Sequence, residues 1–231
     1  MANEAELRMV LVGKTRVGKS AAGNTILRRR AFETMRLPAV AAPVTLRRTG
    51  EFYGQTLALV DTPGLLHPNQ DQDEVKRHIT NCITFAAPGP HVFLVVINPN
   101  RFTVDDRRMM RTIRQIFGEN LARYALLLFT HGDVLEAQER SIEEIIRENP
   151  SLRSIIHQCH GGYHVLNNND GDLTQVLELQ RKIHMLVQRN GGQYYTDEMQ
   201  REPDLGNVMV GFTIGVLVSL LGLGIFRVVR Q

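Results

Sequence analysis

An eight-residue pattern near the start of the chain, G-x-x-x-x-G-K-[ST], leaves few folds open to this sequence. Residues 13–20 read GKTRVGKS, and in this pattern the glycines let backbone N–H groups surround phosphate oxygens. The apolar run Leu7–Val12 before the loop has the composition of a strand, and residues 20–30 after it suit a helix whose N-terminus faces an anion. This order predicts a nucleotide site, with Lys19 on the β- and γ-phosphates and the Ser20 hydroxyl on Mg²⁺.

The rest of the chain alternates between apolar runs and helical stretches, which is typical of an α/β fold. The strand candidates are 57–60, 92–97, 124–129 and 163–166, and three of them are near-continuous apolar runs, as expected for strands buried on both faces. The helix candidates are 71–85, 103–117, 135–148 and 173–188. This alternation predicts a mostly parallel sheet with helices on both faces and ligands at the carboxyl ends of the strands.

The sequence D-T-P-G at residues 61–64 directly follows the strand candidate 57–60. At that strand end the Asp61 carboxylate can hold Mg²⁺ through its water shell, and the Gly64 N–H can meet the γ-phosphate. D-T-P-G alone is compatible with an ordinary turn. Its place after a phosphate loop and a second strand favours a sensor of the γ-phosphate.

Residues 34–49, between these two motifs, are the expected first switch segment. Thr45 and Thr49 are the candidates to complete the Mg²⁺ coordination. We favour Thr45 because the Pro-Val pair before it favours an extended approach of the backbone. The alternative is that this threonine is an ordinary strand residue.

A third motif, Phe129-Thr130-His131-Gly132-Asp133, follows the strand candidate 124–129. A carboxylate at this place can accept hydrogen bonds from N1 and N2 of guanine, which adenine does not offer, and His131 can lie against the base. The alternative for Asp133 is a helix cap. Residues 167–169 read Asn-Asn-Asn after the last strand candidate, where a loop would close over guanine, although a plain polar turn would have the same composition.

Charge and cysteine content exclude some other classes of protein. The chain has 27 basic and 24 acidic residues without a dense Lys/Arg block, which argues against nucleic acid as the main partner. Its two cysteines, Cys82 and Cys159, lack metal-ligand spacing and form no disulfide framework, so a reducing compartment is expected. Residues 1–6 are acidic and do not resemble a signal peptide.

Residues 208–226 read VMVGFTIGVLVSLLGLGIF, nineteen residues without a charge. As a helix they would span roughly 28 Å, close to the thickness of a bilayer core. The alternatives are a buried core helix or a dimer face. We favour a single-pass membrane anchor at the C-terminal end with the body of the protein in the cytosol, and the Arg227 and Arg230 pair does not decide between the endoplasmic reticulum and the mitochondrial outer membrane. The expected organisation is a nucleotide-binding domain at 1–189, a polar linker or extra helix at 190–207, the anchor at 208–226 and a short basic tail at 227–231.

Several motifs together resemble one known family, the GTPases of immunity-associated proteins, whose paraseptin-type G domains are related to septins and to chloroplast-import receptor GTPases. The resemblance covers roughly residues 6–200. Besides D-T-P-G, the motifs are GKTRVGKSAAGNTIL at 13–27, Gly-Pro-His at 89–91, RFTVD at 101–105, Leu-Phe-Thr at 128–130, and Asn-Gly-Gly at 190–192 with Tyr-Thr at 195–196 and Met199. General GTPases lack the Gly-Pro-His box and the Asn-Gly-Gly tail.

The resemblance implies a Ras-like G domain that binds GTP or GDP with Mg²⁺ and forms GTP-dependent dimers or oligomers across the switch face. Some members carry a C-terminal hydrophobic anchor, which residues 208–226 would match. Carried over position by position, the resemblance implies a set of nucleotide contacts: Gly13, Lys14, Thr15, Arg16, Val17, Gly18, Lys19, Ser20, Ala21, Thr34, His131, Gly132, Asp133, Asn167 and Asn168.

Three positions depart from related patterns. The family usually has glycine where this chain has Arg16, and an arginine at the same loop position in guanylate-binding proteins resembles an arginine finger supplied in cis. We therefore consider Arg16 a catalytic candidate beside Lys19; the alternative is a solvent-facing side chain. The base motif has His131 and Gly132 where basic residues are usual. Leu65 stands where small signalling GTPases have a water-orienting glutamine, so we expect slow intrinsic hydrolysis.

Two functional hypotheses follow from these patterns. In the first, the protein is a membrane-tethered GTP-binding switch or scaffold, a weak GTPase that self-associates through its nucleotide face. In the second, it is a P-loop ATPase or phosphotransferase whose hydrophobic tail packs on the body. The sequence shows no basic lid and no acceptor pocket of the kind that a kinase needs, which favours the first hypothesis.

Overall fold

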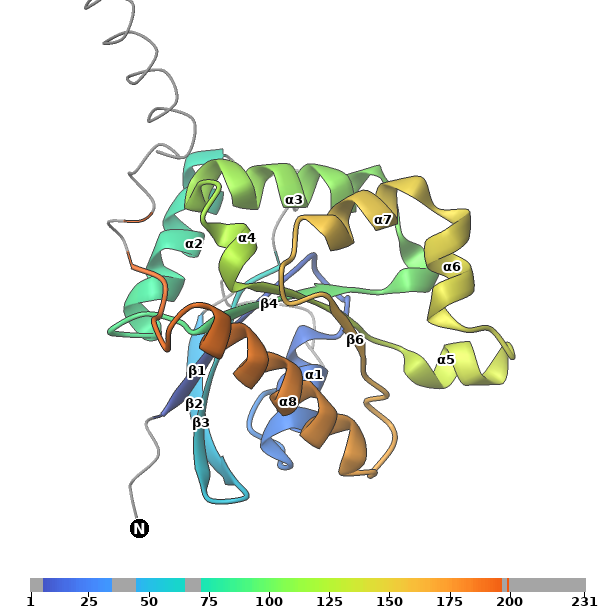
Figure 1. The fold of residues 1–231 in the computed structure, drawn as a ribbon, viewed down its shortest axis with the longest axis horizontal. Helices are drawn as coiled ribbons and strands as arrows, with labels where there is room; N and C mark the ends of the chain where they lie inside the picture. Colours follow the sequence, from blue (N-terminus) through green and yellow to red (C-terminus); the bar gives the residue numbers. More distant parts are fainter. Residues whose placement is uncertain (1–5, 35–44, 65–71, 197–198, 200–231) are drawn as a thin grey trace, which may run out of the picture.

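The computed structural model describes residues 6–34, 45–64, 72–196 and 199. These residues form one mostly parallel sheet with helices on both faces (Figure 1), so the predicted α/β architecture is confirmed. The predicted anchor at 208–226, the tail at 227–231, and residues 35–44 of the expected first switch lie outside the described residues.

Six strands make up the sheet in the order β2-β3-β1-β4-β5-β6. All neighbouring strands pair in parallel except β2, which is antiparallel to β3. The sequence does not predict β2, because its residues LRRTGEF are mostly polar and partly exposed at the edge of the sheet. The strands are β1 (Leu7–Val12), β2 (Leu46–Phe52), β3 (Gln55–Asp61), β4 (Val92–Ile97), β5 (Ala125–Phe129) and β6 (Tyr163–Val165).

Helices cover the sheet in two layers (Figure 1). Side chains of α2, α3, α4 and α7 form one apolar core with one face of the sheet, and side chains of α1 and α8 form a second core on the other face. A short 3-10 turn at Pro99–Arg101 precedes α3. The helices are α1 (Lys19–Leu27), α2 (Gln72–Phe85), α3 (Val104–Phe117), α4 (Leu121–Tyr124), α5 (Gly132–Ala137), α6 (Ile142–Glu148), α7 (Pro150–His157) and α8 (Thr174–Arg189).

The sequence of strand β1 does not alternate between apolar and polar residues, because both faces of the strand are covered. All six of its residues are buried. Val10 and Val12 belong to the core beneath α2 and α3, whereas Met9 and Leu11 belong to the core beneath α1 and α8. A strand that contacts an apolar layer on each face has no polar side, which is the pattern expected for a central parallel strand.

The predicted helix 135–148 is wrong in its boundaries, because two separate helices occupy this region. A capping box at Ser141 starts α6: the Ser141 hydroxyl accepts from the Glu144 N–H, and the Glu144 carboxylate accepts from the Ser141 N–H. Both bonds satisfy backbone donors at a new helix start, and the chain turns there. A further helix that was not predicted, α7, begins at Pro150 under an Asn149 cap.

The segment after α8 packs back on the body of the domain. Tyr195 is fully buried, and its ring lies 5.3 Å from the ring of Phe93 and 5.5 Å from that of Phe117, between centroids. Its hydroxyl donates to the Phe117 carbonyl at 2.5 Å and its N–H donates to the Pro90 carbonyl. The first residues of the predicted linker 190–207 therefore complete the core, and the folded unit extends beyond residue 189.

Among residues 6–34, 45–64, 72–196 and 199, no helix is long and apolar enough to cross a bilayer. The predicted anchor is not among them, so membrane attachment remains a prediction.

We predict that Tyr195 contributes strongly to stability. Tyr195→Ala should lower the free energy of unfolding by about 3–5 kcal/mol, because it removes a large buried ring, and Tyr195→Phe should cost about 1 kcal/mol through the lost hydrogen bond. Urea denaturation of the full chain in detergent, followed by far-UV circular dichroism, measures both. The exposed neighbour Gln193 provides the control, and equal losses for Tyr195→Ala and Gln193→Ala would contradict the prediction.

Candidate functional site

The phosphate loop, residues 13–20, lies at the carboxyl end of β1 and leads into α1. The Lys19 side chain is buried, and its ammonium group donates to the carbonyl oxygens of Gly13 at 3.0 Å and Lys14 at 2.8 Å. The positive charge therefore lies inside the curve of the loop, at the N-terminus of a helix. Loop N–H groups, helix dipole and ammonium together form a site for a polyphosphate.

The structure brings together Ser20 and Asp61, two of the three predicted Mg²⁺ ligands. The Ser20 hydroxyl, at the start of α1, donates to Oδ2 of Asp61, the last residue of β3, at 2.5 Å. The parallel pairing of β1 with β3 places Leu11 opposite Asp61, so this carboxylate lies beside the phosphate loop. Hydroxyl and carboxylate oxygens are ligands that Mg²⁺ prefers, so these residues fit a magnesium ion bound with phosphate.

Gly64, the last residue of the D-T-P-G motif, lies directly against the phosphate loop. A Cβ atom at this position would fall 2.6 Å from both the N and the Cα atoms of Thr15, closer than any side chain allows. Only glycine permits this approach. The D-T-P-G turn therefore packs against the phosphate loop, and the contact of the Gly64 N–H with a γ-phosphate stays a prediction.

The structure brings one of the two predicted switch threonines close to Asp61: Thr45 precedes Leu46, which pairs with Asp61 across β2 and β3, whereas Thr49 lies farther along β2, opposite Ala58. Thr45 is buried before β2, and its side chain is a hydrogen-bond partner of the Cys82 thiol, whose pKa burial raises to about 12. Thr34 is exposed beyond α1, and within the described residues no hydrogen bond joins it to the phosphate loop. Both assignments remain predictions.

The two predicted base-binding loops lie side by side. Asn169 donates from Nδ2 to Oδ2 of Asp133 at 2.8 Å, and the Gly132 N–H donates to the Leu166 carbonyl at 3.3 Å. Asn168 in turn accepts a hydrogen bond from the Thr25 hydroxyl of α1 at 3.0 Å. The loops after β5 and β6 are thus tied to each other and to the helix that follows the phosphate loop.

The proposed helix-cap role of Asp133 does not describe its geometry. The N-cap residue of α5 is His131, with a left-handed φ of 62° and without a side-chain cap. Asp133 lies in the first helical turn, where its carboxylate bonds to Asn169. The arrangement gathers the Asp133 carboxylate and the Asn168 and Asn169 side chains, which offer hydrogen-bond donors and acceptors, in the loops after β5 and β6.

Thr130 is a further site residue, one that is not among the nucleotide contacts predicted from the sequence. It is fully buried, its hydroxyl donates to the Val17 carbonyl at 2.6 Å, and its N–H donates to the Ile97 carbonyl at 3.0 Å. It thereby fastens the phosphate loop to the ends of β4 and β5. The sequence signal for this role is a small hydroxyl residue that directly follows an apolar strand and precedes the base motif.

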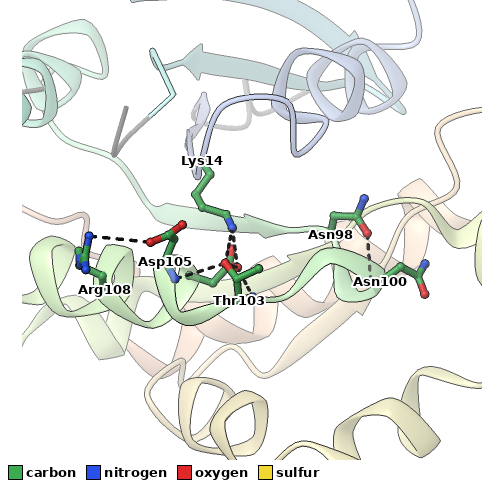
Figure 2. A network of polar contacts seen from close by, with 7 residues as sticks. Lys14, Asn98, Asn100, Thr103, Asp105 and Arg108 are labelled. Carbon is green, nitrogen blue, oxygen red and sulfur yellow. Dashed lines mark hydrogen bonds and ion pairs between the residues drawn. The ribbon is translucent and has the colours of Figure 1, made fainter. Parts of the chain in front are cut away.

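The Lys14 side chain points toward the start of α3 (Figure 2), and its predicted contact with nucleotide stays a prediction. Its ammonium group lies 2.7 Å from Oδ2 of Asp106 and donates to the Thr103 hydroxyl at 3.0 Å. Asp106 is only 1% exposed and also accepts from the Thr103 N–H, completing a capping box. A buried carboxylate needs a positive partner, so this ion pair sets the direction of Lys14 and links the loop to α3.

Arg16 has a left-handed backbone, with φ at 64°, and an exposed side chain. This conformation favours glycine, which agrees with the glycine usual at this position in the resembled family. Within the part of the chain that the structure describes, no hydrogen bond or ion pair holds the Arg16 side chain. The guanidinium therefore lies at the outer rim of the loop.

Comparison with known proteins gives a family match over most of the chain. The sequence profile of the AIG1 family matches residues 7–208. The human protein named GTPase IMAP family member 8 is 32% identical over 197 residues, covering 84% of this chain and 29% of that protein. Immune-associated nucleotide-binding protein 1 of Arabidopsis thaliana is 30% identical over 208 residues, covering 87% of this chain and 92% of that protein.

Solved structures share the fold at lower identity. Toc33 from Arabidopsis thaliana in complex with GDP and Mg²⁺ aligns with a TM-score of 0.56 and 19% identity, over 80% of this chain and 85% of that chain. A second structure concerns the chloroplast translocon components atToc33 and psToc159, in which dimerization is important for the GTPase activity. It aligns with a TM-score of 0.61 and 20% identity, over 78% of this chain and 82% of that chain.

We predict that the Lys14–Asp106 pair is strongly coupled. Lys14→Met should cost about 3 kcal/mol of unfolding free energy without nucleotide, because it leaves a buried carboxylate without its cation, and Asp106→Asn in the same chain should recover part of this loss. A double-mutant cycle measured by urea denaturation gives the coupling energy. The exposed Arg108–Asp105 pair, 3.8 Å apart, is the control, with an expected coupling below about 1 kcal/mol. Equal coupling in the two pairs would refute the buried-pair argument.

Proposed function

The chain belongs to the AIG1 family, and on this premise we propose that it is a membrane-tethered GTP-binding protein, a slow GTPase that self-associates in its GTP-bound state. The observation that carries the proposal is the hydrogen bond between Ser20 and Asp61 beside the buried Lys19. It joins a phosphate loop and a candidate magnesium site on the sheet edge that also carries Asp133. The chain spans 29% of the length of the human relative.

In the proposed bound state, each part of the site has one task. Lys19 and the loop N–H groups hold the β- and γ-phosphates, and Ser20 and Asp61 hold Mg²⁺, which would neutralise phosphate charge. The GDP and Mg²⁺ bound to Toc33 support this assignment for a related fold. Gly64 would report whether a γ-phosphate is present through its N–H, and its close approach to Thr15 supports this role.

Guanine preference would rest on Asp133. Its carboxylate accepts a hydrogen bond from Asn169, which orients it, and guanine offers two further donors at N1 and N2. Adenine offers an acceptor at N1 instead of a donor, so it would leave the carboxylate without its bonds. A site built around such a pair discriminates strongly.

Hydrolysis would be slow because the residue after Gly64 is Leu65, which cannot orient a water molecule. We propose that Arg16 supplies the missing charge when two domains meet across the nucleotide edge. Its exposure at the rim of the loop and its position within the phosphate loop support this role. The importance of dimerization for GTPase activity in atToc33 and psToc159 supports the same arrangement.

The membrane tether would be the uncharged segment 208–226. Its length matches a bilayer core, and the folded unit already holds Tyr195 and Met199 against its body shortly before the segment begins. The attached domain would then meet other copies within the plane of one membrane, where the effective concentration is high.

Isothermal calorimetry on the full chain in detergent with Mg²⁺ tests the nucleotide. We expect GTP and GDP to bind and ATP not to compete, and Asp133→Asn should weaken guanosine nucleotides by about 100-fold because two charge-assisted hydrogen bonds are lost. Glu139→Gln is the control: it neutralises an exposed carboxylate on the same side of the domain and should leave nucleotide binding unchanged. Tight binding of ATP would favour the alternative of an ATPase or phosphotransferase and overturn the proposal.

GTP turnover measured against protein concentration tests self-association and Arg16 together. In the wild type, turnover per molecule should rise as dimers form. Arg16→Ala and Arg16→Gly should abolish this rise, a loss of about 10³-fold or more if the guanidinium acts as a finger. The glycine variant also relieves the left-handed backbone, so it separates the charge from loop distortion. Arg181→Ala on α8 is the control, and an unchanged rise in both Arg16 variants would contradict this role.

A further inference from the structure

The outward face of α3 carries a concentrated positive charge. Arg107, Arg108 and Arg111 follow one another at helical spacing and are all exposed, whereas Asp106, Met109 and Met110 point into the body. Arg108 lies 3.8 Å from Asp105, but both side chains are more than half exposed, so this pair neutralises little of the charge. We call Arg107, Arg108 and Arg111 the α3 arginine stripe.

A groove of about 490 Å³ separates α3 from α7 beside this stripe. Arg107 and Arg111 line one wall, Ser151 and Ser154 line the other, and the buried side chains of Met110 and Ile155 lie between them. The Arg107 guanidinium donates to the Ser151 hydroxyl at 3.0 Å. Guanidinium and hydroxyl donors around an apolar floor match a phosphate group that is attached to a glycerol backbone.

The described chain ends close to the same helix. Asn120 follows the end of α3 and its side chain donates to the Met199 carbonyl at 3.4 Å. Residues 200–207 separate this point from the uncharged segment 208–226. Eight residues reach at most about 30 Å when fully extended. An anchor in the bilayer would therefore hold the C-terminal end of α3, beside Asn120, within about 30 Å of the membrane surface.

We propose that the α3–α7 groove and the α3 arginine stripe form a docking site for the anionic phospholipid headgroups of a bilayer. The inference rests on the membrane tether of the proposed function and adds an orientation to it: the α3 layer faces the lipid, and the α1 and α8 layer faces away. Three arginines near an anionic surface favour the docked orientation by about 100-fold. Because Lys14 holds Asp106 at the start of the same helix, the docked helix adjoins the nucleotide loop.

Fluorescence energy transfer to lipid-borne acceptors measures the orientation. Cys82 and Cys159 are the two cysteines of the chain, both are buried, and burial raises the pKa of each thiol to about 12, so one introduced cysteine is labelled selectively. The dye is placed at Gln115→Cys on α3 or, as a control, at Glu178→Cys on α8. The full-length protein is reconstituted in phosphatidylcholine vesicles with or without 30% phosphatidylserine (roughly the level that gives a physiological surface charge).

We expect phosphatidylserine to increase transfer from position 115 and not from position 178, and high salt to remove the increase. The variant Arg107→Glu/Arg108→Glu/Arg111→Glu should lose it. The variant Arg30→Glu/Arg181→Glu/Arg189→Glu makes the same change in net charge on the other layer and should keep it. Unchanged nucleotide binding shows that each variant is folded. The loss of the increase at high salt is measured on the wild type, so it tests the docking site even if a variant does not fold.

Vesicle flotation distinguishes a failure of the docking site from a failure of the membrane tether. Wild-type protein that floats with vesicles of both compositions but shows no dependence on phosphatidylserine would overturn the docking site and leave the tether intact. Protein that floats with neither vesicle would overturn the tether and the docking site together. Tight binding of a single-stranded RNA oligonucleotide through the same three arginines, without lipid dependence, would also overturn the inference in favour of a nucleic-acid surface.

Discussion

The position of β1 between β3 and β4 determines the rest of this structure. Parallel pairing on both sides of β1 aligns the carboxyl ends of three strands, with Leu11 opposite Asp61 and Val12 opposite Val95. The phosphate loop therefore emerges between the D-T-P-G turn and the segment that leads to α3. The contacts of Ser20 with Asp61 and of Lys14 with Asp106 each join the phosphate loop to one of these neighbouring segments. Residues distant in sequence meet because the sheet is parallel, as in other open α/β folds.

The interior strands and the main motif loops could be predicted from the sequence because their signals are local and strong. Strands buried on both faces are continuous apolar runs, and the glycine-rich loops can adopt few alternative geometries. Strand β2 gave no such signal: it is a polar edge strand whose pairing with β3 decides its structure. Ser141 and Glu144 form a capping box at the start of α6, a signal for the division between α5 and α6 that the predicted helix 135–148 did not take into account.

In the candidate site, too, local motifs predict some features, and tertiary contacts decide the others. Ser20 and Asp61, from motifs far apart in the sequence, meet in a hydrogen bond, and Gly64 lies against Thr15 of the phosphate loop. The direction of the Lys14 side chain was not predicted, because the motif leaves that position open and a buried carboxylate on a distant helix determines it. Thr45 likewise bonds to a cysteine of α2, a partner that no local pattern reveals. Directions of long or rotatable side chains depend on tertiary partners, so sequence spacing alone leaves them undetermined.

The placement of Tyr195 has a practical consequence for anyone who shortens this polypeptide. A recombinant fragment that stops at the last residue of α8 would keep every strand and helix up to that point but would leave Phe93, Phe117 and Tyr124 without the ring that covers them. Such a fragment would expose an apolar aromatic surface and tend to aggregate during purification. A soluble version suitable for crystallisation should retain the chain through Met199.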